Sequence, residues 1–289
     1  MATLKQIRRR IRSVKSTQQI TRAMEMVAAA KLKRATDRAL ASRPYARKAA
    51  EVLRSLAGAA GSLSHPLFEE RPVARKLVVV IASDKGLCGS YNMTVFRRME
   101  NEYPRANRSG LLLYPVGRRA DAYFGKRPWE LIASLPELGD QTNPQKAKRL
   151  AAELVQLYLD KKVDSVSLVF TRYVSVISRR VVEEPLLPIV PDKSATADGD
   201  NAANENYIFE PSPEAIFETL LPRYIENRVL QAMSESLASE HAARMVSMGA
   251  ASKNAKEVIE RLTLEGNKLR QAAITREISE IVGGVEALK

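Results

Sequence analysis

The chain has 289 residues, of which 45% are hydrophobic, and this is enough for one large domain or two smaller ones. Its single cysteine excludes an internal disulfide and fits a reducing compartment. No apolar run approaches the roughly 18 residues of a membrane span, and the N-terminal residues lack the continuous apolar region of a secretory signal peptide.

The net charge of +13 is concentrated in residues 1–60, which hold fifteen basic and only three acidic side chains. A basic segment of this kind attracts nucleic acid, anionic lipid or an acidic protein surface, and a solvated helix face is the alternative. Because no aromatic or glycine-rich RNA motif accompanies the arginines, nucleic acid is not expected as a partner. A mitochondrial presequence is a further interpretation of the Arg-rich start.

The N-terminal segment has the pattern of a long helix. Between Thr3 and Pro44 there is neither proline nor glycine, and apolar residues recur at steps of three and four, first over residues 4–14 and then over residues 20–27. Pro44 is expected to kink or end this helix, because proline removes an amide donor and clashes with the preceding turn.

The middle of the chain alternates between strand and helix patterns, which predicts a mostly parallel sheet with helices on both faces. Strands are expected at residues 77–82, 111–116 and 163–170, with 173–182 as a hairpin or edge neighbour, and helices at residues 92–103, 118–124 and 146–159. The polar segment at residues 192–206 predicts a flexible loop.

The C-terminal segment predicts a second long helix. Pro211 and Pro213 mark its start, Ser212 is a candidate cap, and apolar residues follow a period of about 3.6 from there to the end of the chain. Sixty helical residues span roughly 90 Å, which is longer than a domain of this size, so the helix needs a partner. An antiparallel coiled coil with the N-terminal helix supplies one, and separate packing of each helix on the middle domain is the alternative.

The expected fold is therefore α/β, with a long antiparallel coiled coil of the two terminal helices and a Rossmann-like α/β domain between them. The expected division places the N-terminal coiled-coil helix at residues 1–60, the α/β domain at 75–190, a flexible loop at 191–210 and the C-terminal coiled-coil helix at 211–289.

The turn ASDKGLCGSYN, residues 82–92, follows the first buried strand and has the outward features of an active site. A nucleophilic cysteine needs a base, but His65 lies in a loop segment and His241 lies on the C-terminal helix, where we expect it to be far from the sheet. A packed thiol is the alternative for Cys88. Gly86 and Gly89 fit neither a P-loop nor a dinucleotide fingerprint, so turn geometry explains them better than a phosphate cradle does.

Other chemistry finds little support in the sequence. One cysteine and two distant histidines make no recognisable metal site. The carboxylate pairs Glu69–Glu70 and Glu183–Glu184 are interpreted as surface charge. We therefore predict no catalytic residue, no cofactor site and no metal site.

Four segments together resemble the gamma subunit of F-type ATP synthase of the bacterial type: QIRRRIRSVKSTQQITRAMEMVAAAKLKRA, SDKGLCGSYN, SEHAARMVSMGAASKNA and GNKLRQAAITREISEIVGG. Since the first of them carries a stalk motif, the Arg-rich start is expected to be mature protein. The resemblance implies that the terminal helices form a central stalk inside a hexamer of three alpha and three beta subunits. The α/β domain would then be the foot, beside the epsilon subunit and the c-subunit ring.

The same resemblance implies a function and a location. The chain would be a rotor that couples transmembrane ion flow to ATP synthesis or hydrolysis on the beta subunits, without catalysing a reaction itself and without a cofactor. It would lie at the cytoplasmic face of the bacterial plasma membrane, as a peripheral protein held through the c ring. No regulatory cysteine pair is present, so the thiol switch of chloroplast members is not expected.

The resemblance also implies contact residues. Met24 would face an acidic lever of the beta subunit, Arg270 and Gln271 would contact a beta loop, and Thr275, Glu277 and Glu280 would lie in a region linked to coupling. The foot contacts would be Lys31, Lys33, Arg34, Tyr207, Phe209 and Glu210. Burial in the coiled coil is the alternative for Met24, and solvation is the alternative for Arg270, Glu280 and the basic cluster. The loop 192–206 and the tail VEALK depart from the family pattern.

Overall fold

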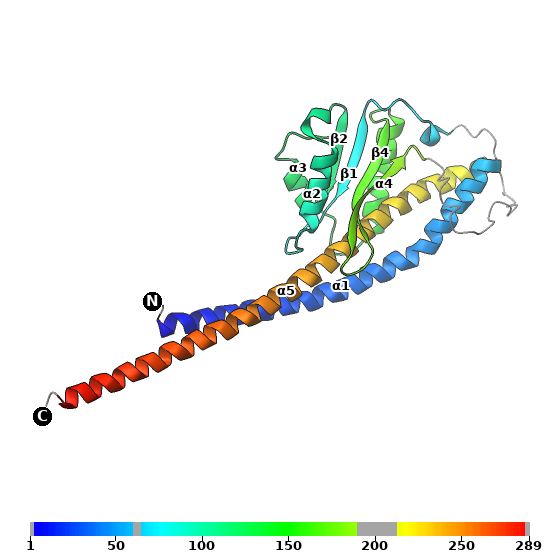
Figure 1. Cartoon of the computed structure of the whole chain (residues 1–289). Helices are drawn as coiled ribbons and strands as arrows, with labels where there is room; N and C mark the ends of the chain where they lie inside the picture. Colours follow the sequence, from blue (N-terminus) through cyan, green and yellow to red (C-terminus); the bar gives the residue numbers. More distant parts are fainter. Residues whose placement is uncertain (1–2, 60–64, 190–212, 287–289) are drawn as a thin grey trace. The chain divides into compact units, whose positions relative to one another are not determined.

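The computed structural model describes residues 3–59, 65–189 and 213–286. Tyr207, Phe209, Glu210, the cap Ser212 and the loop predicted at 192–206 lie outside these ranges. The chain divides into two compact units, one of residues 29–243 and one that combines residues 1–28 with residues 244–289. Helix α1 (Leu4–Ala59) and helix α5 (Pro213–Glu286) each contribute to both units (Figure 1).

A five-stranded sheet organises the larger unit, with the strand order β3-β2-β1-β4-β5. The first four strands in this order are parallel, and β5 pairs with β4 in the antiparallel direction. The mostly parallel sheet predicted from the sequence is confirmed. The strands are β1 (Lys76–Ile81), β2 (Leu111–Val116), β3 (Glu130–Leu131), β4 (Ser165–Tyr173) and β5 (Arg179–Leu187).

Helices cover both faces of the sheet, as the uninterrupted apolar runs of β1 and β2 require. On one face, Val78 and Val80 contact α2 (Tyr91–Glu102) and α3 (Arg118–Phe124) through one apolar cluster. On the other, Leu77, Val79 and Ile81 belong to a second cluster with α4 (Pro144–Leu159) and the first part of α5. Two short 3-10 helices, η1 (Pro66–Phe68) and η2 (Arg105–Asn107), lie in connecting segments.

Both long helices continue through proline. Helix α1 runs past Pro44, so the prediction that this residue could end the helix is wrong. Helix α5, described from Pro213 onward, continues through Pro222. Proline in a helix interior costs about 3 kcal/mol. Next to Pro222, burial of Leu221 and Ile225 offsets that cost, because a fully buried aliphatic side chain contributes about 1.5–3 kcal/mol.

In the smaller unit the two helices pair in opposite directions. A Cβ placed on Gly266 would lie 3.4 Å from Ile7 Cγ2, and one placed on Gly249 would lie 3.0 Å from Glu25 Oε1. Since the later position on α5 lies against the earlier position on α1, the helices are antiparallel. Ile7 is 1% exposed, and Thr21 and Ala28 are also buried on α1. The predicted antiparallel coiled coil is confirmed in this unit, while residues 221–237 of α5 pack on the sheet in the other.

The pairing in the smaller unit predicts different costs for two isoleucines of α1. Ile7→Ala should reduce the free energy of unfolding of this unit by about 2–4 kcal/mol, because it leaves a cavity against α5. Ile20→Ala is the matched control, since Ile20 is 57% exposed and its truncation should cost less than about 0.5 kcal/mol. Hydrogen exchange of the α1 amides in the intact chain measures both. Equal protection in the two variants would contradict the pairing.

Candidate functional site

The edge of the sheet where a ligand would be expected is occupied by α5. In open α/β sheets, ligands bind at the carboxyl ends of the strands where the strand order reverses, which here is the boundary between β1 and β4. At that edge Ser239 Oγ of α5 donates to the carbonyl oxygen of Thr171 at 2.9 Å. The hydroxyl of Tyr91 donates to the carbonyl oxygen of Ser236 at 3.0 Å. Residues 232–243 of α5 are all buried, so this helix fills the crevice.

The turn after β1 is closed by its own hydrogen bonds. Ser83 N donates to Asn92 Oδ1 at 3.0 Å, and Asn92 Nδ2 lies 3.5 Å from Cys88 Sγ. Leu87 and Gly89 both adopt positive φ angles, 59° and 58°, which produce the sharp strand-to-helix turn. The glycine-rich sequence therefore serves backbone geometry at this position.

Cys88 is 2% exposed and packs against Tyr91 and Ala243. Its Sγ lies 3.8 Å from the carbonyl oxygen of Lys85, a contact in which the thiol donates. A buried thiol that donates to a carbonyl acts as a small apolar group with a weak donor, and a nucleophile needs solvent access and a positive environment. This environment favours the packed thiol.

The structure corrects the expected position of His241. The residue is 1% exposed and lies two positions after Ser239, within the buried stretch of α5 that packs on the sheet. The expectation that it is far from the sheet is wrong, because α5 itself covers the carboxyl edge of β4.

Asp84 connects the turn to two other loops. One carboxylate oxygen accepts hydrogen bonds from Arg118 N and Leu138 N, both at 3.1 Å, and the other accepts from Gly139 N at 2.7 Å. Three backbone donors are thus satisfied by one side chain. Asp84 therefore connects the turn after β1 to α3 and to the segment before α4.

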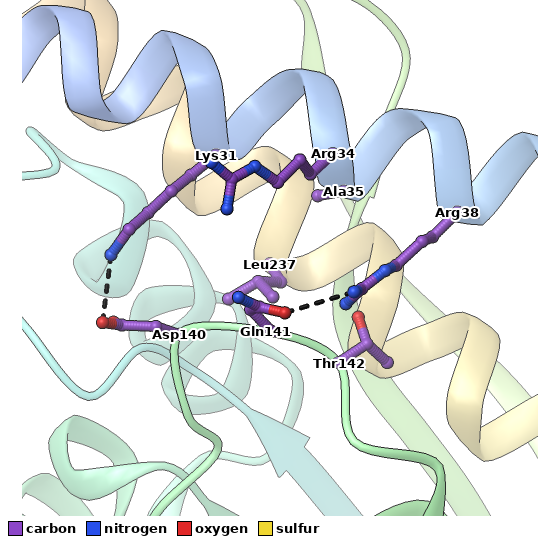
Figure 2. A pocket seen from close by; sticks show the side chains of 8 residues that line it. All are labelled: Lys31, Arg34, Ala35, Arg38, Asp140, Gln141, Thr142 and Leu237. Atoms are coloured by element: carbon purple, nitrogen blue, oxygen red, sulfur yellow. Dashed lines mark hydrogen bonds and ion pairs between the residues drawn. The ribbon is translucent and has the colours of Figure 1, made fainter.

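The next residue of the turn, Lys85, joins an ion network that reaches α1. Lys85 Nζ lies 2.9 Å from Asp140 Oδ1, and Lys31 Nζ of α1 lies 3.0 Å from Asp140 Oδ2. Hydrogen bonds from Lys85 and Lys31 lower the pKa of Asp140 to about 2. Arg38 Nη2 donates to Gln141 Oε1 at 3.2 Å, about two turns after Lys31 along α1 (Figure 2). These contacts fasten α1 to the loop before α4.

The pair Glu183–Glu184 is not the surface charge that the sequence suggested. The side chains are only 16% and 18% exposed and point to opposite faces of β5, Glu183 to Lys76 and Glu184 to Arg172 and Arg228. Burial of Glu183 opposes ionisation, but hydrogen bonds from Lys76 and Ser167 and the charge of Lys76 outweigh it and lower the pKa of Glu183. Both carboxylates belong to ion pairs that stabilise the edge of the sheet.

The far end of α5 extends beyond the reach of α1. Ile7 already lies opposite Gly266, and α1 begins only three residues earlier, at Leu4. From about residue 270 to Glu286, α5 therefore has no partner among the described residues of α1, a length of roughly 25 Å. An apolar stripe follows this end, with exposed fractions of 48–61%, at Ile274, Ile278, Ile281 and Val282. The sequence placed these residues in a buried seam, but α1 is too short to cover them.

The part of the chain that the structure describes contains neither a candidate metal site nor a helix suited to span a membrane. Within residues 3–59, 65–189 and 213–286, no three His, Cys, Asp or Glu side chains gather in a way that could hold a metal ion. None of the described helices combines the length and the apolar content that a bilayer crossing requires.

Comparison with known proteins gives the family of the chain. A family model described as ATP synthase matches residues 3–288. The ATP synthase gamma chains of Heliobacterium modesticaldum and Desulfitobacterium hafniense are 45% and 47% identical to this chain, and each alignment covers 100% of both proteins. The chain belongs to the ATP synthase gamma chain family.

Two solved structures of ATP synthases contain chains of similar fold. In the central stalk and c ring of Tetrahymena thermophila mitochondrial ATP synthase, one chain is 28% identical, with a TM-score of 0.61 over 81% of this chain and 99% of its own length. A chain of the Euglena gracilis mitochondrial ATP synthase rotor shares the fold at 20% identity, with a TM-score of 0.65 over 94% of this chain and 98% of its own. The chain thus shares its fold with chains of the central stalk and rotor of two mitochondrial ATP synthases.

The residues that the family resemblance singles out fall into separate places. Met24 is half-buried on α1 in the smaller unit. The helix α5 residues Arg270, Gln271, Thr275, Glu277 and Glu280 are all exposed and lie on its unpaired end. Lys31, Lys33 and Arg34 belong to the larger unit, where Lys31 is half-buried in its ion pair and the other two are exposed. Their contacts with other subunits stay predictions.

The ion network predicts a pH dependence of stability. The folded pKa of Asp140, about 2, lies below its usual value of 3.8, so the ionised carboxylate stabilises the fold above pH 4. This contribution is lost as the pH falls from about 4 towards 2. Because Asp140 is 49% exposed, its pairs contribute no more than about 1 kcal/mol. Asp140→Asn should lose that contribution at pH 7 and flatten the acid limb of the stability curve.

Urea unfolding between pH 2 and pH 7 measures the effect, with Glu130→Gln, an exposed carboxylate of β3, as the control. An unchanged pH profile in Asp140→Asn, or an equal change in the control, would contradict the role of the network.

Proposed function

We propose that the chain is the rotating shaft of the synthase, which couples ion flow through the c ring to ATP synthesis or hydrolysis on the beta subunits without catalysing either. The observation that carries this proposal is the exposed apolar end of α5. A 74-residue helix whose last part bears a stripe of 48–61% exposed aliphatic side chains needs a surface outside the chain to bury them. A sleeve formed by three alpha and three beta subunits fits that requirement.

A non-catalytic role agrees with the position of α5 on the sheet. The crevice where a Rossmann-like sheet would bind a nucleotide holds residues 232–243 of this helix. The same stretch continues into the smaller unit as the shaft. In this chain the sheet therefore supports a helix at the position where an enzyme of the same topology would place its ligand.

The proposed mechanism is a shift of populations among beta conformers. A shaft that is not symmetric about its axis makes different contacts with each beta subunit at each angle, and only such differential contacts can bias open against closed states. The contacts proposed for this are Met24 on α1 and Arg270, Gln271, Thr275, Glu277 and Glu280 on α5. The exposure of the α5 residues supports the proposal, although Glu280 also accepts a hydrogen bond from Arg276 at 3.0 Å.

The foot is proposed to face the epsilon subunit and the c ring, through Lys31, Lys33, Arg34, Tyr207, Phe209 and Glu210. The proposed location is the cytoplasmic face of the bacterial plasma membrane, where the c ring would hold the chain. Exposure of Lys33 and Arg34 supports a partner on this side. Lys31 is committed to Asp140, so its contribution would be to hold α1 in place.

Assembly tests the proposal directly. Mixed with the alpha and beta subunits of the same organism, the chain should copurify at one copy per three beta subunits. Mass measurement of the purified complex gives the ratio. A hexamer that forms and hydrolyses ATP while the chain elutes separately would contradict the proposal.

Removal of the unpaired end tests the mechanism. Truncation after Lys268 leaves the pairing of Ile7 with Gly266 intact, so the fold should survive. ATP-driven ion pumping by the assembled complex should fall by about tenfold, since coupling free energies are usually 1–3 kcal/mol. A control truncation that removes only residues 287–289 should change it little. Equal pumping by both truncated forms would count against the contacts named on α5.

A further inference from the structure

A small pocket opens between α1 and the loop that precedes α4, within the larger unit (Figure 2). Lys31, Arg34 and Arg38 line it from α1, and Asp140, Gln141 and Thr142 line it from the loop. The three cations are spaced by three and four residues, which places them on one face of the helix. Lys31 and Arg34 are also among the residues proposed for the foot, but no role assigned above uses the space between them and the loop.

The pocket carries an excess of positive charge. Of its lining residues only Asp140 is acidic, and that carboxylate is shared between Lys31 and Lys85. Arg34 makes no ion pair or side-chain hydrogen bond with any of the residues that the structure describes. Cations three and four residues apart on a helix repel one another, so an additional negative group would stabilise this face of α1.

Donors on the loop side complete the arrangement. Gln141 Oε1 accepts from Arg38, which leaves its Nε2 as a donor, and Figure 2 draws this nitrogen on the side of Arg34. Thr142 Oγ1 lies 3.2 Å from Ser234 Oγ, whose single proton also lies toward the carbonyl oxygen of Leu230 at 2.7 Å, and the hydroxyl of Thr142 donates to none of the residues that the structure describes. Arg34, Gln141 Nε2 and Thr142 Oγ1 thus supply a positive charge and hydrogen-bond donors around one space. An oxyanion requires both for binding.

We propose that this pocket binds a small oxyanion of the phosphate class. Its volume of about 30 Å³ has room for about two water-sized spheres, which suits the head of such an anion. Nucleotide-sized ligands occupy pockets of roughly 300–1,000 Å³ and are excluded on size. Arg34 and Thr142 hold the anion from opposite sides, so the bound anion joins α1 to the loop before α4. The source is free phosphate or the phosphomonoester headgroup of a lipid.

Titration of the purified full-length chain tests the pocket. Inorganic phosphate, compared with chloride at equal ionic strength, should bind with a millimolar dissociation constant and raise the unfolding temperature. Arg34→Gln should weaken binding by about tenfold, because it removes a charge-assisted hydrogen bond. Arg97→Gln, an exposed arginine of α2, is the matched control and should leave the affinity unchanged.

A second variant keeps the net charge. Thr142→Val removes only a hydroxyl, so weakened phosphate binding in this variant also supports the pocket if Arg34→Gln does not fold, as judged by circular dichroism. Absence of phosphate binding beyond that of chloride, or equal loss in Arg97→Gln, would overturn the assignment for free phosphate.

Vesicles that contain phosphatidate distinguish the two sources. Binding to these vesicles but not to free phosphate, lost in Arg34→Gln and Thr142→Val and retained in Arg97→Gln, would assign the lipid headgroup. Vesicle binding that is unaffected by Arg34→Gln, together with no binding of free phosphate, would refute the proposal in both forms.

Discussion

Burial of residues 232–243 of α5 at the carboxyl edge of the sheet is the interaction on which the rest of the structure depends. Hydrogen bonds from Ser239 to Thr171 and from Tyr91 to Ser236 fix the helix at that edge. They satisfy polar groups that would otherwise be costly to bury. The same helix continues in the smaller unit as one half of the coiled coil, so one element serves both as a sheet-covering helix and as a coiled-coil strand.

The turn after β1 shows how a signature that resembles an active site can be structural. Asp84 accepts three backbone hydrogen bonds, Lys85 reaches Asp140, and Asp140 reaches Lys31 on α1. The charged pair therefore connects the sheet to the N-terminal helix, while the neighbouring serine, cysteine and asparagine close the turn itself. The polar residues of this turn hold neighbouring segments of the chain in position. Their hydrogen-bonding groups are used in contacts within the chain.

Much of the fold could be predicted from the sequence, because hydrophobic periodicity in long segments indicates the type of secondary structure. The boundaries of β2 and α3 were predicted to the residue, and β1, α2 and α4 within two residues. Strand β3 was missed because its two residues are too few to show a period. The predictions that His241 is far from the sheet and that Glu183 is exposed were wrong. Both residues are buried by segments that are distant in sequence, and such burial leaves no local pattern. Exposure of Ile278 likewise depends on where α1 begins, which the α5 sequence does not encode.

The exposed aliphatic stripe on the end of α5 affects the stability of the chain when no other subunit is bound. Four aliphatic side chains on a single unsupported helix are a site for nonspecific association, and an unpaired helix end opens readily to proteases. Both features favour proteolysis or aggregation of a copy whose stripe is uncovered. If alpha and beta subunits cover the stripe, as proposed above, synthesis of the chain has to match the supply of those subunits.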